Sequence, residues 1–184
     1  MNDRDQRFVN WLTKLQEQPN GRAVMAELRR GLGQPPGLAP TVGRYVQPFL
    51  TPEDSEKREE AYYLIASLFG LHPSSIGSGN MGQHFARLWT GEKDPPDNIA
   101  RRFNILLAAD WDTLPDYLRQ AIGLLKSNAS PVAVNWAQLL DDVLGWERPD
   151  GKVQLRWSRT FWRKSQGDSD IQIYNQPSYS KGDI

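Results

Sequence analysis

The chain has 184 residues and no cysteine, and its 22 basic and 22 acidic residues give a formal net charge of +0. The lack of cysteine excludes disulfides, thiolate catalysis and cysteine-based zinc sites. The sequence does not open with a basic stretch and an apolar run, and no apolar run approaches the ~18 residues of a membrane span, so we expect a cytoplasmic protein without membrane contact.

In the first half of the chain, apolar residues recur at helical spacing. Thr51 and Pro52 predict the N-cap and the first residue of a helix that ends at Gly70. The proline- and glycine-rich segment 33–43 is typical of a loop. The helices expected here cover residues 8–15, 25–32, 52–70 and 81–88.

The second half shows the same spacing, beginning with the apolar face of Ile99 and Phe103. Asp112, Asn135 and the pair Asp150–Gly151 predict three further helix starts. No run alternates with the period of a strand. The predicted fold is therefore all-α, with two small packed helical bundles at 1–94 and 95–164 and a C-terminal polar tail at 165–184 that need not be ordered.

Enzyme motifs are weak. Gly77, Gly79 and Gly82 match the dinucleotide fingerprint G-x-G-x-x-G, but no strand is expected before them, so a tight loop entering a helix is favoured. His72 and His84 have no evident metal co-ligands, which favours local hydrogen bonding or surface roles. Adjacent carboxylates at 59–60 and 141–142 point to different sides of their helices. We expect no catalytic residue, no metal and no cofactor.

The last predicted helix carries a row of cations. Its basic residues are spaced 4, 3 and 4 apart, so they lie on one face beside an apolar stripe: Lys152, Arg156, Arg159 and Arg163. Such a row suits a phosphate backbone. It equally suits a solvated face or ion pairs with acids on neighbouring helices. Both interpretations stay open at this point.

Other cations extend the candidate nucleic-acid site. They lie beside apolar stripes or at helix ends: Arg22, Arg29, Arg30, Arg101, Arg102, Arg119 and Lys126. Lys126 also has a structural reason, because a cation near a helix C-terminus stabilises the helix dipole. Tryptophan could add stacking platforms for bases. However, Trp11, Trp136 and Trp157 fall on apolar stripes, where core packing is favoured.

The ordered segments GRAVMAELRRGLG, AYYLIASLFGLHP, GNMGQHFARL, ARRFNILLAAD and KVQLRWSRTFW resemble the CasB family, the small subunit of the type I-E CRISPR Cascade effector. The resemblance covers about residues 8–164. It implies an all-α fold without catalytic activity. By position in AELRRG and ARRFN, it matches Arg29, Arg30, Arg101 and Arg102 to basic positions of the family.

The resemblance also implies partners. Two copies would lie head to tail against the other Cascade subunits, both the backbone subunits that hold the guide RNA and the large subunit. The basic surface would steady the R-loop formed by guide RNA and target DNA, chiefly the displaced single strand, without reading sequence. No small-molecule substrate is implied. The alternatives are a helical protein–protein adaptor without nucleic-acid contact and a hydrolase built around the two histidines.

Overall fold

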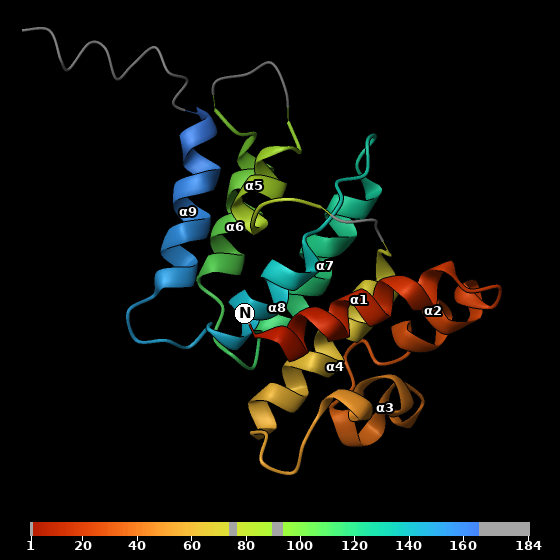
Figure 1. Cartoon of the computed structure of the whole chain (residues 1–184). Helices are drawn as coiled ribbons and strands as arrows, with labels where there is room; N and C mark the ends of the chain where they lie inside the picture. The colour runs from red at the N-terminus through yellow and green to blue at the C-terminus, as the bar shows by residue number, and fades with distance from the viewer. Residues whose placement is uncertain (1, 74–76, 90–93, 166–184) are drawn as a thin grey trace, which may run out of the picture.

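The computed structural model describes residues 2–73, 77–89 and 94–165, which form helices and connecting turns without a strand (Figure 1). The all-α prediction is confirmed. The α-helices are α1 (Asp3–Glu17), α2 (Gly21–Arg29), α3 (Pro40–Val46), α4 (Glu56–Leu71), α5 (Met81–Ala86), α6 (Asp97–Leu107), α7 (Leu114–Ser127), α8 (Trp136–Leu144) and α9 (Lys152–Ser165). Two short 3-10 turns, η1 (Pro36–Leu38) and η2 (Gln47–Phe49), flank α3.

Side-chain caps define several helix starts. The Asn2 side chain accepts a hydrogen bond from the backbone N–H of Asp5, and Asn80 does the same for Gln83, each within a capping box. The predicted cap Asn135 is confirmed, because its Oδ1 accepts from the Gln138 N–H at 3.1 Å. At the start of α9, Asp150 Oδ1 accepts from the Lys152 N–H at 3.2 Å.

Two predicted helix starts are wrong because a neighbouring aspartate organises the chain differently. The Asp54 carboxylate accepts from the Thr51 N–H at 2.7 Å and from Arg4, so residues 51–54 form a turn and α4 begins after the cap Ser55. Likewise Asp110, not Asp112, accepts from the Thr113 N–H at 2.9 Å ahead of α7.

The predicted loop 33–43 contains the start of α3, which sequence reading missed. Pro40 occupies the first turn, where its missing N–H leaves no bond unmade. Val42 and Val46 are buried. A Cβ atom on Gly43 would lie 3.0 Å from the Tyr63 hydroxyl. The helix is therefore fixed by packing against α4, which local composition does not reveal.

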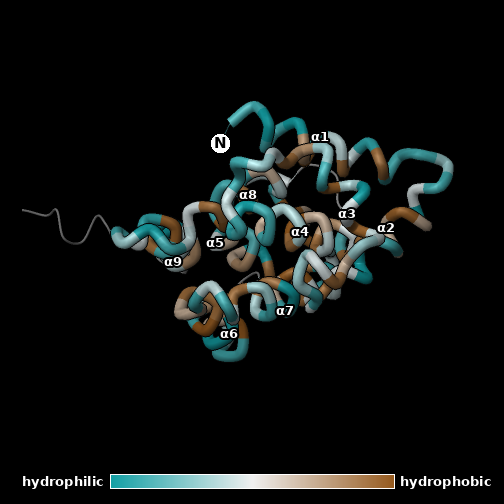
Figure 2. The backbone as a smooth tube through the Cα atoms, turned by 90° about the horizontal axis from the view of Figure 1, so that it is seen from below, coloured by the Kyte–Doolittle hydropathy of each residue, from teal (hydrophilic) through white to brown (hydrophobic). Residues whose placement is uncertain are grey.

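Helix α4 forms the centre of the core. Nearly all of its second half is buried, and it contacts α2, α3, α7 and α8. Figure 2 shows α4 between α1 and α7. The predicted burial of Trp136 and Trp157 is confirmed, whereas Trp11 is 36% exposed and the expectation of core packing there is wrong.

A second group of aromatic rings joins α5, α6 and α9. The rings of Phe103 and Phe161 stack with centroids 4.1 Å apart, and Phe85 lies 5.2 Å from Phe103. A Cβ atom on Gly82 would collide with the backbone carbonyl of Trp157. The glycine therefore permits the close approach of α5 to α9.

The division into bundles at 1–94 and 95–164 stays a prediction. Helices on both sides of that boundary share the core, since α4 contacts α7 and α8 and α1 contacts α8. Residues 166–184 of the predicted tail lie outside the described residues. Within the described part of the chain, no helix is both long and apolar enough to cross a bilayer.

Candidate nucleic-acid interface

All eleven predicted site residues are exposed, but the structure divides them into separate groups. Arg22 and Arg29 come from α2, Lys126 ends α7, and the row from Lys152 to Arg163 runs along α9. Helices α2 and α9 lie at opposite ends of the molecule in both orientations (Figures 1 and 2). One continuous basic face is therefore absent from the described residues.

The first group forms what we term the basic groove, an open hollow of about 730 Å³ between α2, the end of α4 and the end of α7. Arg22, Arg29 and Lys126 line it, and none of the described residues that line it is a carboxylate. The Lys126 ammonium donates to the Leu71 carbonyl at 2.9 Å, which holds it at the rim. Residues far apart in the sequence thus place three cations around one concave surface.

Close packing of two backbones brings the walls of the basic groove together. A Cβ atom on Gly70 would lie 2.7 Å from Leu28 Cβ and 2.9 Å from the Arg29 nitrogen. Only glycine allows α4 to approach α2 this closely. The Arg29 side chain then donates through Nε to the Met25 carbonyl at 3.4 Å.

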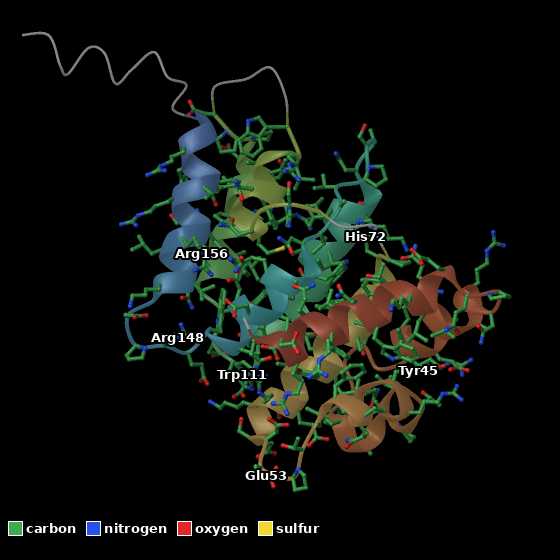
Figure 3. The ribbon with its side chains drawn as sticks, viewed as in Figure 1. Tyr45, Glu53, His72, Trp111, Arg148 and Arg156 are labelled. Carbon is green, nitrogen blue, oxygen red and sulfur yellow. The ribbon has the colours of Figure 1, made fainter. Side chains whose placement is uncertain are left out.

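His72 lies at the basic groove, at the end of α4 (Figure 3). Its Nε2 lies 2.9 Å from the Val132 carbonyl. Because a carbonyl only accepts, Nε2 carries the proton. His72 therefore anchors the chain after α7 beside Lys126. Sequence reading missed its place here, since only the fold brings residue 72 next to residues 22 and 126.

The α9 row is split between paired and unpaired cations. Lys152 forms an ion pair with Asp150 at 2.6 Å, and Arg156 donates to the buried Asp142. Arg159 and Arg163 have no ion-pair partner among the described residues. The ion-pair interpretation thus applies to the first two members of the row, and the phosphate interpretation stays a prediction for the last two.

Asp142 organises the contact between α8 and α9. Besides Arg156, it accepts from the Trp157 indole N–H at 2.6 Å and from Gln138 Nε2 at 2.8 Å. Burial raises the pKa of Asp142, and these hydrogen bonds and the nearby guanidinium oppose that rise. Arg156 is therefore part of the packing of α9 as well as of its surface (Figure 3).

The remaining candidates are scattered. Arg101 and Arg102 project from α6 without an ion pair in the described part of the chain, and Arg102 borders a 60 Å³ hollow beside Ile105. Arg119 lies 3.6 Å from Asp116, in a different cavity from the basic groove. Arg30 caps the end of α2 near Glu27.

The two histidines have structural roles. His84 is buried and its Nε2 accepts from the Asn135 N–H at 3.1 Å. Burial lowers the pKa of His84 to about 4. The expectation of local hydrogen bonding is confirmed for both histidines, but neither lies on the surface. Among the residues described, no three histidine or carboxylate side chains gather where they could hold a metal ion.

The glycines of the fingerprint match shape a loop, as expected. Gly79 has a φ of 95°, in the left-handed region, just before α5. A Cβ atom on Gly77 would collide with the Ala133 carbonyl. In the loop that leads into α5, Gly77 therefore allows a close backbone contact and Gly79 supplies a left-handed backbone conformation.

Comparisons with known proteins agree with this architecture. Residues 24–162 match the family model described as CRISPR-associated protein Cse2. A protein of that name from Thermus thermophilus is 37% identical over 158 residues, which cover 85% of this chain and 89% of the relative.

Solved structures resemble the chain over most of its length. The crystal structure of CasB from Thermus thermophilus superposes with a TM-score of 0.74 at 33% identity, covering 89% of this chain and 99% of that one. A chain of a CRISPR RNA-guided surveillance complex has the same fold, with a TM-score of 0.71 at 21% identity over 94% of this chain and 98% of that one.

Proposed function

The chain belongs to the Cse2 family of CRISPR-associated proteins, as its sequence predicts, and we propose that it is a non-catalytic subunit of an RNA-guided surveillance complex that binds the nucleic-acid backbone. Its role there is to stabilise the R-loop, chiefly the displaced single strand. The likeness in fold to a chain of such a complex supports this assignment.

The observation that carries the proposal is the basic groove. Arg22, Arg29 and Lys126 face one concave surface that has no carboxylate among its described lining residues. Three cations without a competing anion attract phosphates and release counterions when a strand binds. Contacts to phosphate position a strand but carry no base information, which fits a subunit that leaves sequence reading to the guide.

The absence of a catalytic role is supported by how the two histidines are used. His72 donates to the Val132 carbonyl, and His84 accepts from the Asn135 N–H inside the core. The low pKa of His84 keeps the ring neutral at physiological pH, where it accepts that bond. Neither ring is available as a general base at a surface site.

A salt titration tests the proposal. The double variant R22Q/R29Q removes two cations from the basic groove and leaves shorter, polar, uncharged side chains in their place. If each arginine contacts one phosphate, the slope of log affinity against log salt for single-stranded DNA falls by about 1.4, or about 0.7 per contact. The matched control is R7Q/K57Q, which removes two exposed cations that pair with Asp3 and Glu147.

The outcome separates two functions. An unchanged slope in R22Q/R29Q would remove the basic groove from the interface and leave Arg101, Arg102, Arg159 and Arg163 as the remaining candidates. The absence of any DNA binding would favour the protein–protein adaptor. Three of the predicted cations are already less available to phosphate, because Lys152, Arg156 and Arg119 each lie near a carboxylate of the same chain.

A further inference from the structure

The outer face of α9 carries two exposed apolar side chains beside its cations. Leu155 is 47% exposed and Trp162 is 37% exposed. They are about two helical turns apart, so they lie one above the other along the helix. Helix α9 packs against α5 and α6 by its other side and lies at the edge of the molecule (Figures 1 and 2). Both side chains therefore face away from the core.

Two arginines accompany Trp162 on this outer face. Arg159 and Arg163 are both exposed, and neither forms an ion pair with another described residue. Residues three and four apart are neighbours on a helix, so Arg159 lies between Trp162 and Arg163. The sequence of α9 contains no carboxylate. We term Arg159, Trp162 and Arg163 the α9 edge, which places an aromatic ring next to two cations.

The indole ring of Trp162 is held by the aromatic cluster beneath it. It meets the ring of Phe161 at an interplanar angle of 83°, with the centroids 4.8 Å apart. Phe161 is itself fully buried and stacks on Phe103. A side chain that is already fixed loses little conformational entropy when a ligand binds to it. The exposed part of the Trp162 ring is therefore a preorganised apolar surface.

We propose that the α9 edge binds a single-stranded nucleic acid, with an unpaired base stacked on Trp162 and adjoining phosphates on Arg159 and Arg163. This inference rests on the proposed function and adds to it a contact that selects single strands. Proteins that bind single strands combine cations along the backbone with aromatic side chains on which bases stack. In a duplex each base is covered by its neighbours, so Trp162 contributes nothing there.

The charge and spacing of the outer face favour nucleic acid over a protein partner. The centre of a protein–protein interface is depleted of charged residues, whereas each exposed apolar side chain of α9 has an arginine beside it. A helix that docks into an apolar groove presents apolar anchors on successive turns. The turn between Leu155 and Trp162 presents Ser158 and Arg159 instead. A nucleotide, which joins a flat base to an anion, matches both parts of the α9 edge.

Two strands of equal charge test the stacking contact. The full-length protein is titrated with a short oligothymidylate and with an abasic strand that has the same number of phosphates but no bases. The ratio of the two affinities isolates the contribution of the bases. We expect the oligothymidylate to bind about fivefold more tightly or better, as the stacking of one base on an aromatic ring provides. Equal affinities for the two strands would overturn the proposal.

Three variants locate the stacking at Trp162. W162L keeps an apolar side chain without an aromatic face and should bring the affinity ratio toward one. W162F keeps a smaller ring and should retain most of the ratio. The matched control is W11L, which removes a tryptophan of α1 that is 36% exposed and should leave the ratio unchanged. Because the ratio compares two ligands of one variant, a fraction of unfolded protein does not alter it. A wild-type ratio in W162L contradicts the proposal.

The remaining measurements separate this proposal from the proposed function. R159Q/R163Q removes phosphate contacts and should weaken both strands by a similar factor, because such contacts carry no base information. Undiminished binding of both strands would remove these arginines from the site and overturn the proposal. If the abasic strand binds and W162L changes nothing, only this proposal fails. If neither strand binds, the proposed function fails as well. Loss of W162L from the co-purified complex with an unchanged ratio would assign the α9 edge to a protein subunit, against the proposal.

Discussion

Arg156 on α9 donates a hydrogen bond to Asp142 on α8, and the Asp142 side chain is fully buried. R156E is therefore expected to place a second carboxylate against a buried one. Leaving a buried charged acceptor without its donor costs about 1–3 kcal/mol, which lowers the melting temperature of a domain of this size by about 2–12 °C. Thermal unfolding followed by circular dichroism measures the change.

The control for R156E is R159E, which reverses the charge of an arginine three residues further along α9. Arg159 has no ion-pair partner in the described part of the chain, so its reversal should shift stability by at most about 0.5 kcal/mol. Equal melting temperatures for R156E and R159E would show that the bond to Asp142 contributes nothing to folding. Only R159E can report on nucleic-acid binding without a change in stability.

His84 makes stability depend on pH. Its pKa falls from 6.5 to about 4 in the folded protein because burial disfavours the charged ring. The unfolded chain therefore binds the proton more readily between these two values. The contribution of His84 is fully present above pH 6.5 and is lost as the pH falls toward 4, by about 3 kcal/mol. Denaturant unfolding at a series of pH values measures the loss.

H84Q isolates that contribution. A glutamine carbonyl can replace Nε2 as the acceptor for the Asn135 N–H but does not titrate. The fall in stability between pH 6.5 and 4 should be shallower in H84Q than in the wild type or in H72Q, which keeps His84. If H84Q and H72Q follow the same curve, another group controls acid unfolding.

Replacing two helical glycines by alanine is expected to change the stability of the protein in opposite directions. G70A places a Cβ atom against Leu28 and the backbone of Arg29, and overpacking of this kind costs about 1–3 kcal/mol. G123A, in α7, places a Cβ atom where nothing lies within 4 Å and should stabilise the helix by about 0.5–1 kcal/mol. Chemical denaturation of both variants tests the sign of each effect. Stabilisation by G70A would contradict the close contact of α2 and α4.

Two tryptophans of the apolar stripes should respond differently to truncation. Trp136 is 3% exposed and packs edge-on against Phe69, so W136A is expected to cost about 3–5 kcal/mol. Trp11 is 36% exposed, and W11A should cost far less. The melting temperatures of the two variants provide the measurement. A stable W136A with weakened DNA binding would make Trp136 a stacking residue.

Helical periodicity was enough to predict the long helices α7 and α9, because each carries an apolar stripe that the core requires. Helix α4 carries no such stripe, since its second half is buried on nearly every side. The errors arose where tertiary contacts decide. Arg4 on α1 donates a hydrogen bond to Asp54, which holds Asp54 in a turn outside the helix. Helix α3 forms because Val42 and Val46 are buried against α4. Neither contact is local, so no pattern around residue 42 or 54 reveals it.

The candidate site was predicted residue by residue but not as a surface. Spacing placed Arg156 and Arg159 on one side of α9, yet only the fold shows that Asp142 binds one of them. The basic groove joins residues 22, 29 and 126, whose sequence positions give no reason to group them. Arg119 looked equivalent to these cations, although it lies among carboxylates.

The position of α4 has a consequence for how the protein opens. This helix contacts α2 and α3 on the N-terminal side and α7 and α8 on the C-terminal side. Its amide protons can exchange with solvent only when both sets of contacts separate. Backbone amides from Ile65 to Phe69 should therefore exchange at the rate of global unfolding, while those of α9 exchange through smaller openings. An isolated fragment ending at residue 94 would expose the face of α4 that α8 covers, and would self-associate through it.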